Sequence, residues 1–302
     1  MWLTITILAY FILAIVFLVD KYLLTKALPN PKVYVFYVGT LGLLALVLAP
    51  FIGFYIPEKS QIILALSAGS SFIFGLFWLY RTLRIFEASR VVPAVGGLTP
   101  LFTAGLIYIS SGGKEVLSCQ EMIAFVLLVL GSILINLQKE KMINLRSFGL
   151  SLFTAFFLSL AFVLTKYVYL DQPFWNGFIW RSIGGFLMAL IFFIIFPEIR
   201  KEIFKKREKI DKKSTFVFLI NQAAGGGAAI LQNFAIFLAP LVYISVIHAL
   251  NGIQYVFLFI FSLFLSLKFP QIIKEEISKE IIFQKISAII LIGLGLVLIA
   301  FK

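Results

Sequence analysis

Polar side chains inside long apolar segments are the positions of this sequence that could bind a solute. Lys166 lies near the end of one such segment and Arg181 lies about two turns into the next, so both belong to the same face of a membrane. An arginine fork and a lysine ammonium can together hold a carboxylate or a phosphate. In the alternative, Lys166 extends to the interface and Arg181 pairs with Asp171 or with a backbone carbonyl.

A second polar group follows helical spacing further along the chain. His248, Asn251, Gly252 and Tyr255 would share one face of a continuous helix, where they could contact substrate. His248 is the only histidine, and an unperturbed imidazole titrates near neutral pH, so it is also a candidate for proton coupling. The alternative is a neutral imidazole that is hydrogen-bonded between helices.

A run of three glycines follows two amide side chains. Asn221 and Gln222 precede Gly225, Gly226 and Gly227. Amides within a membrane are candidate substrate ligands. Consecutive glycines loosen a helix and permit close backbone approach, so the run predicts either a hinge or close packing. No Gly-Lys-Ser/Thr follows, so the run is not a phosphate loop.

Small residues recur at four-residue spacing in an earlier segment. Ser67, Ser71, Gly75 and Trp78 would share one helix face. Such spacing is typical of a packing seam between membrane helices, which is the prediction for Ser71 and Gly75. Trp78 could instead line the cavity and contact substrate, because aromatic side chains combine an apolar body with a polar group.

Several classes of catalytic and cofactor site have no counterpart in the sequence. No Asp or Glu lies in the middle of an apolar segment, and the HExxH, GxSxG and phosphate-loop motifs are absent. Cys119 is the only cysteine, which excludes an internal disulfide and a cysteine-rich metal site. We therefore expect no enzyme activity, no cofactor and no bound metal.

The composition places these residues in a membrane protein. Of 302 residues, 61% are hydrophobic and 13% are charged, and the apolar runs are too continuous for a membrane β-barrel. The net charge of +12 lies in short connectors, so nucleic acid is not an expected partner. We predict an all-α membrane protein with ten transmembrane helices. The predicted spans are 3–19, 33–53, 62–80, 91–110, 122–137, 148–170, 174–196, 215–238, 241–267 and 286–301.

The two halves of the sequence resemble each other, which predicts two five-helix repeats, residues 1–138 and 147–302. Five helices are an odd number, so the second repeat would enter the membrane from the opposite face and the repeats would be inverted. Many secondary transporters have this plan, with the substrate site between the repeats. The main matches are Lys21 with Lys166, Tyr22 with Tyr167, Gly75 with Gly226, Gln120 with Gln284, Ala124 with Ala288, and Gly131 with Gly295.

These motifs, in this order, resemble the EamA-like family of the drug/metabolite transporter superfamily. Residues 87–135 are similar to that family's fourth helix, Gly-Glu turn and fifth helix, with Pro100 at the helix-4 proline. Lys166 and Arg181 resemble its lysine at the end of one helix and its arginine early in the next. Phe36 occupies the matching position of the first half, so no cationic pair carries over there. The resemblance implies a carrier of small metabolites, often an exporter.

Positive charge is divided unequally between the two faces. One face carries 21 of the 26 Lys and Arg residues, which the positive-inside rule assigns to the cytoplasm, with both termini outside. Members of the resembled family have both termini in the cytoplasm, so the orientation is open. The other face carries Lys59, Lys114, Lys166, Arg181 and Lys302.

Together these features predict a secondary-active transporter in the cell membrane that exports small metabolites by alternating access. Arg181 as a carboxylate clamp favours amino acids, and a nucleotide-sugar or lipid-linked-sugar carrier is the second choice. A scaffold or assembly factor that carries no flux is the alternative from another class. An intramembrane enzyme with His248 as base would need a nearby carboxylate or nucleophile. The expected partners are a small-molecule substrate and membrane lipids, with a homodimer left open.

Overall fold

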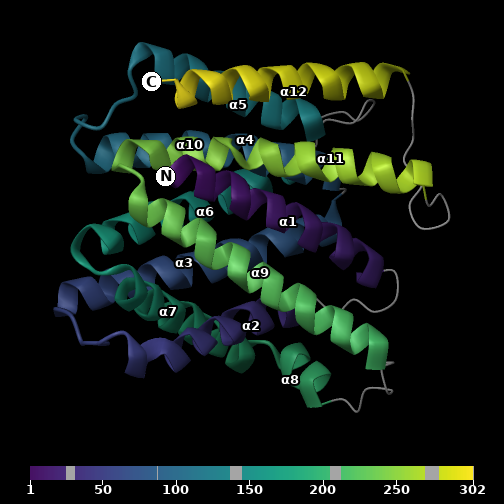
Figure 1. Cartoon of the computed structure of the whole chain (residues 1–302). Coiled ribbons are helices and arrows are strands. Elements are labelled where there is room, and N and C mark those ends of the chain that lie inside the picture. The colour runs from purple at the N-terminus through teal and green to yellow at the C-terminus, as the bar shows by residue number, and fades with distance from the viewer. Residues whose placement is uncertain (25–30, 87, 137–144, 205–211, 269–278, 302) are drawn as a thin grey trace.

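The protein, described by a computed structural model, is a bundle of helices (Figure 1). The structure describes residues 1–24, 31–86, 88–136, 145–204, 212–268 and 279–301, which contain no strand. The α-helices are α1 (Trp2–Leu24), α2 (Pro31–Gly42), α3 (Lys59–Ile85), α4 (Ala88–Ser110), α5 (Cys119–Asn136), α6 (Leu145–Asp171), α7 (Phe174–Ile195), α8 (Pro197–Phe204), α9 (Lys212–Leu238), α10 (Ile244–Ala249), α11 (Asn251–Lys268) and α12 (Lys279–Ala300). Two 3-10 helices, η1 (Leu43–Phe51) and η2 (Leu241–Tyr243), extend α2 and precede α10.

Eight helical segments of the described chain are long and apolar enough to cross a membrane, so the protein is an all-α, multi-pass membrane protein. The sequence predicts ten spans, and the other two correspond to α5 and α9. The apolar part of α5, Cys119–Ile135, is shorter than the eight. The helix α9 has 27 residues and contains four amide side chains. The amides are Asn221, Gln222, Gln232 and Asn233.

Two predicted spans are not single α-helices. The span 33–53 is α-helical only as far as Gly42 and continues as the 3-10 helix η1, which contains Pro50. A proline lacks the amide N–H that an α-helix interior requires. The span 241–267 is divided at Leu250, whose N–H bonds to the carbonyls of Val246 and His248 and ends α10. The short helix α8 lies between the predicted spans 174–196 and 215–238, where the sequence predicts a connector.

An ion pair joins α8 to the start of α2. Lys32 Nζ lies 2.9 Å from Glu198 Oε1. The hydrogen bond from the Lys32 ammonium lowers the pKa of the Glu198 carboxylate, because it favours the charged form. Both side chains contact solvent, so the pair positions α8 more than it stabilises the fold.

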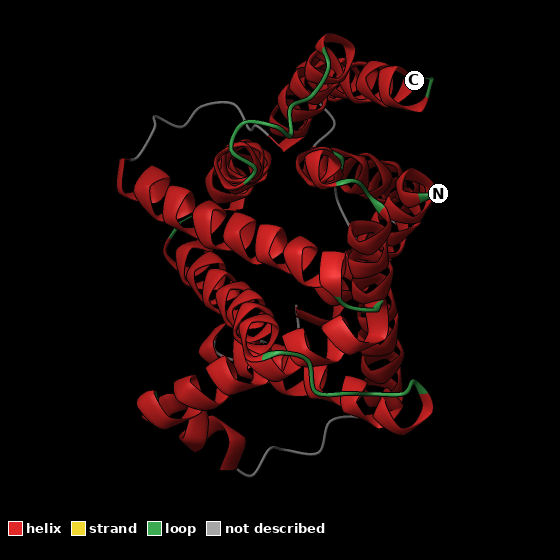
Figure 2. Ribbon diagram, turned by 90° about the vertical axis from the view of Figure 1, so that its left-hand side faces the viewer, coloured by secondary structure: helices red, strands yellow, loops and turns green. Residues whose placement is uncertain are grey.

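The long helices pack in a pattern that recurs between the two halves. α1 lies along α9 and α11, and α6 lies along α3 and α4. Three further pairs, α2 with α7, α4 with α10 and α5 with α12, each join one helix from either half. The α5–α12 pair lies at one edge of the bundle and the α2–α7 pair at the opposite edge (Figure 1). Short loops connect the helices at their ends (Figure 2).

α5 and α12 contact each other through reciprocal hydrogen bonds. Gln120 Nε2 donates to the carbonyl of Leu298 over 2.9 Å, and Gln284 Nε2 donates to the carbonyl of Leu134 over 2.7 Å. Each glutamine lies near the start of its helix and each carbonyl near the end of the other, so the two helices are antiparallel. A shift of 164 residues along the sequence converts either bond into the other.

Glycines allow the same two helices to approach closely. A Cβ added at Gly131 would lie 3.1 Å from the carbonyl oxygen of Ala288, and one added at Gly295 would lie 3.0 Å from that of Ala124. The 164-residue shift relates these contacts as well. The contact is therefore self-complementary, with equivalent residues on both sides. All three predicted matches between α5 and α12 fall in it.

We expect Gly131→Ala and Gly295→Ala to destabilise the protein by similar amounts, about 1–3 kcal/mol each, because the new methyl groups overpack the α5–α12 contact. Gly293→Ala is the matched control, since a Cβ at this position of α12 meets nothing within 4 Å. Thermal unfolding of the purified protein in detergent measures the effect. An equal loss in all three variants would contradict the close contact.

Candidate functional site

Arg181 is buried among α3, α6 and α7 without a carboxylate partner in the described chain. Its Nε donates to Thr165 Oγ1 over 2.9 Å, and its guanidinium carbon lies 4.7 Å from the centre of the Phe72 ring. The side chain is 8% exposed. The predicted alternative partner, Asp171, accepts a hydrogen bond from Gln61 instead.

The terminal nitrogens of Arg181 have no hydrogen-bond partner among the described residues. A buried charge is costly unless it is paired, and the Phe72 ring face offsets part of that cost through a cation–π contact. The two free nitrogens of a guanidinium form the planar fork that binds a carboxylate or a phosphate. The arrangement is therefore a cationic side chain whose fork keeps its capacity to donate hydrogen bonds to an anion.

A row of aromatic rings connects Arg181 to His248. The ring of Phe72 lies edge to face with that of Phe162, with centroids 6.1 Å apart, and Phe162 stacks on His248 at 3.9 Å. His248 is 5% exposed, and its Nε2 is buried without a hydrogen-bond partner in the described part of the chain. Two of the predicted residues are thus brought into one cluster, which we call the Arg181–His248 cluster.

Lys166 has a separate partner from Arg181. Its Nζ donates to the carbonyl of Phe237 over 3.0 Å, in the last turn of α9. A cation at this position satisfies a free helix-end carbonyl and interacts favourably with the helix dipole. Lys166 is 4% exposed, so its ammonium stays inside the protein rather than extending to the interface.

The break between α10 and α11 divides the predicted His248 stripe. Asn251 is half-buried at the start of α11, and Tyr255 packs against the buried apolar cluster that includes Leu128 and Ile253. Gly252 lies against α5, where an added Cβ would collide with Ser132 Oγ. Gly252 and Tyr255 therefore have packing partners of their own, and the Phe162 stack involves His248 from this group.

The polar and glycine positions of α9 have different surroundings. Asn221 is buried and donates to the carbonyl of Val16 over 3.3 Å, which ties α9 to α1. Gly225 also faces Val16, with the added Cβ 3.5 Å from Cγ1. A Cβ at Gly226 or Gly227 would meet nothing within 4 Å, so these two glycines are not closely packed within the described structure.

Further contacts of α9 reach the interior. The hydroxyl of Tyr169 donates to Asn233 Oδ1 over 3.2 Å, beside the Arg181–His248 cluster. Gln232 is half-buried on α9, and the buried Tyr10 of α1 donates from its hydroxyl to the carbonyl of Ile247 over 2.9 Å. The remaining predicted amide, Gln222, is half-buried.

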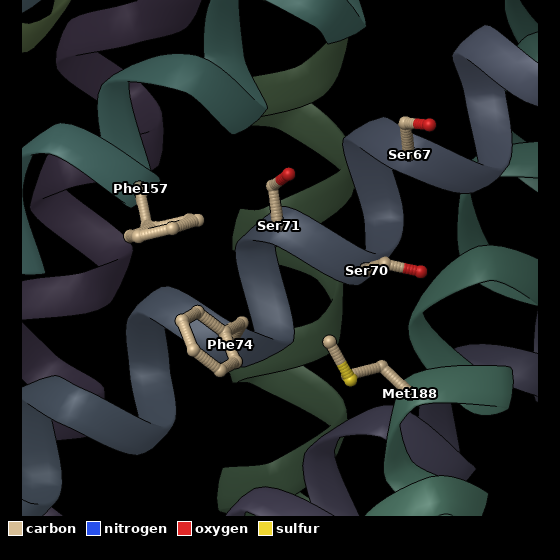
Figure 3. Close-up of a pocket in the computed structure, with 6 residues that line it drawn as sticks. All are labelled: Ser67, Ser70, Ser71, Phe74, Phe157 and Met188. Carbon is tan, nitrogen blue, oxygen red and sulfur yellow. The ribbon is translucent and has the colours of Figure 1, made fainter.

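A separate cavity of about 310 Å³ opens on α3 (Figure 3). Ser71 faces this cavity, whereas Gly75 packs on Leu158 of α6, with an added Cβ 2.9 Å from Cδ2. Trp78 lies one turn further along α3, with its ring 6.4 Å from that of the lining residue Phe74, and its Nε1 is buried without a hydrogen-bond partner in the described chain. Successive helix residues point about 100° apart, so Ser71 and Phe72 face different directions. The lining residues are Ser67, Ser70, Ser71, Phe74, Phe157 and Met188.

Four residues that were not predicted from the sequence complete the Arg181–His248 cluster. Phe72 lies on α3, and Phe162, Thr165 and Tyr169 lie on α6. The three on α6 follow helical spacing, which predicts a shared face. That face was detectable from the sequence, but nothing in the sequence identifies Arg181 as its partner.

We expect Thr165→Val to destabilise the protein by about 1.5–3 kcal/mol more than Thr154→Val, because it leaves the Arg181 Nε without an acceptor. Both hydroxyls bond to a carbonyl of their own helix, so the second variant controls for that loss. Thermal unfolding measures the difference. Equal destabilisation would show that the Arg181–Thr165 bond contributes nothing.

Comparison with known proteins shows the fold and no more. No family model matches the chain, and no curated protein matches it. A solved crystal structure, described only as that of a protein, is similar with a TM-score of 0.66 over 99% of this chain and 95% of that chain. The two sequences are 13% identical, so the likeness extends to the arrangement of helices alone.

Proposed function

We propose that the protein is a secondary-active transporter that exports small metabolites such as amino acids across the cell membrane by alternating access. The observation that carries this proposal is the buried guanidinium of Arg181, whose fork has no anion among the described residues. A carboxylate of the substrate would complete the site. His248 Nε2, at the other end of the ring row, is a second group that could bind the substrate.

The packing of the helices supports a two-repeat architecture. We propose that residues 1–138 and 147–302 are inverted five-helix repeats of the EamA-like type, with α5 and α9 also crossing the membrane. The recurrence of the α1 contacts in those of α6 agrees with this arrangement. The reciprocal glutamine bonds of α5 and α12 are those expected on a two-fold axis. A solute site between such repeats is typical of secondary transporters.

The Arg181–His248 cluster favours a carrier over the alternatives. A scaffold gains nothing from a buried cation without a partner, because that cation only destabilises the fold. An intramembrane enzyme would need a carboxylate or a nucleophile beside His248, and its described contact is the ring of Phe162.

We expect Arg181→Ala and Arg181→Lys to reduce the affinity for carboxylate substrates by about 10- to 100-fold, because a charge-assisted hydrogen bond contributes about 1.5–3 kcal/mol. Folding should be retained. Arg181→Ala removes the unpaired charge, and Arg181→Lys replaces the five guanidinium donors with the three of an ammonium. A thermal-shift screen of amino acids, sugars and nucleotides identifies the substrate. Uptake into liposomes that contain the purified protein then measures saturable flux.

Arg81→Gln is the matched control, because this exposed arginine lies over Trp78 at the end of α3, outside the Arg181–His248 cluster. Its flux should equal that of the parent. Unchanged flux in both Arg181 variants would remove Arg181 from the site. The absence of any saturable flux for the parent protein would favour the scaffold.

A further inference from the structure

A chain of side-chain amides closes the end of the bundle where α6 turns into α7. Gln61 Nε2 donates to Asp171 Oδ2, and Gln172 Nε2 donates to Gln61 Oε1 over 3.4 Å. Asn176 Nδ2 donates to Gln172 Oε1 over 3.0 Å, and the backbone N–H of Tyr55 donates to Asn176 Oδ1 over 3.2 Å. Each amide thus donates once and accepts once, and the chain ends on a carboxylate. Such a chain is polarised in one direction, which strengthens its members.

The amide chain joins the two halves of the protein. Tyr55 and Gln61 belong to the first half, and Asp171, Gln172 and Asn176 belong to the second. One turn after Asn176 on α7, Trp180 Nε1 donates to the carbonyl of Tyr55 over 3.2 Å and holds the same loop a second time. Gln172 and Asn176 are each 3% exposed, so the bond between them is shielded from water, whereas the Gln61–Asp171 bond lies at the exposed end of the chain.

Close packing of α3 on α7 extends this closure. A Cβ added at Gly69 would collide with the carbonyl oxygen of Arg181, and one added at Gly184 would collide with that of Leu66. The equivalent helices of the other half, α9 and α2, make no comparable contact among the described residues. Close packing of this kind is therefore found between α3 and α7 but not between α2 and α9 in the part of the chain that the structure describes.

The sequence provides no second amide chain at the equivalent positions. The 145-residue shift that relates α6 and α7 to α1 and α2 matches Asp171 with Lys26 and Asn176 with Pro31. Neither replacement can accept and donate as the amide chain requires, because lysine only donates and proline has no polar side chain. The amide chain is therefore specific to the end of the bundle where Gln61 contacts Asp171.

We propose that the Gln61–Asp171–Gln172–Asn176 chain is a latch that holds this end of the pathway closed, so that the resting state opens toward the opposite end. Thr165 lies six residues before Asp171, and Arg181 lies five residues after Asn176. At 1.5 Å per residue the latch is within about 10 Å of the Arg181–His248 cluster along the helix axes. Release of the latch gives solvent a route to Arg181 from this end. The role in transport rests on the function proposed above, but the latch itself is testable without a substrate.

The test replaces one donor of the latch with an acceptor. Gln61→Glu keeps the shape of the side chain but places a carboxylate against Asp171, so the bond is lost and like charges repel. The reporter is Val168→Cys in a Cys119→Ser background, because Val168 is 0% exposed and lies on α6 between Thr165 and the latch. The rate of its modification by a maleimide in detergent should rise roughly tenfold or more when the latch opens.

Two further variants decide between the latch and a general effect of charge. Gln61→Glu with Asp171→Asn restores the bond with its polarity reversed, so the rate should return to within about twofold of the parent. Lys59→Gln changes the net charge by the same amount at an exposed neighbouring position and should leave the rate unchanged. Faster hydrogen exchange at Tyr55 in Gln61→Glu provides a reading that does not need the cysteine.

An unchanged rate in Gln61→Glu with unchanged exchange at Tyr55 would overturn the latch. So would an equal rise in Lys59→Gln, or a failure of the double variant to restore the parent rate. Each of these outcomes is independent of flux. A transporter without a latch would show saturable flux and an unchanged modification rate in Gln61→Glu. A latched protein that does not transport would show the faster modification and no flux.

Discussion

In the hydrocarbon region of a membrane, a polar side chain can find a hydrogen-bond partner only inside the protein. Most serine and threonine hydroxyls of the described chain bond to a carbonyl of their own helix, and several other polar side chains bond to a backbone carbonyl of another helix. Lys166 binds the end of α9, Gln120 binds α12, and Ser132 binds the carbonyl of Ala249. Against that background the Arg181 fork and His248 Nε2 stand apart, together with Trp78 Nε1 and Ser151 Oγ, because none of them has a hydrogen-bond partner in the described chain. The need for hydrogen-bond partners inside the protein therefore joins the helices to one another, and the groups without such partners include the candidate site.

The sequence was sufficient to place most of the long helices, because continuous apolar runs ended by charges are a strong signal. It was also sufficient to match Gln120 with Gln284 and Gly131 with Gly295, which meet in one contact. The break at Leu250 could not be predicted, because it depends on how the chain packs after it turns. Gly252 fits against Ser132 of α5, and no local pattern reveals that tertiary contact. The ten spans and the orientation stay predictions.

For the site, residue types were predictable and partners were not. Lys166, Asn221 and Arg181 are all polar side chains within apolar segments, and the sequence predicts each of them as a substrate ligand. In the structure the first two bind carbonyls of α9 and α1, which only the folded positions of those helices can supply. The rings of Phe72 and Phe162 complete the Arg181–His248 cluster, yet they are two of 34 phenylalanines and carry no individual mark. The sequence shows which side chains can form hydrogen bonds, but the packing of the helices decides which partners they have.

The reciprocal contact of α5 with α12 has a consequence for how such a chain could arise. Because either helix presents equivalent groups to the other, a half-length protein carrying one of them could dimerise through the same surface without any new interaction. Tandem duplication of its gene would then turn an encounter between molecules into one within a molecule, at a far higher effective concentration. Each half would afterwards be free to diverge, one gaining a cation and the other losing it, while the joint between them stayed intact.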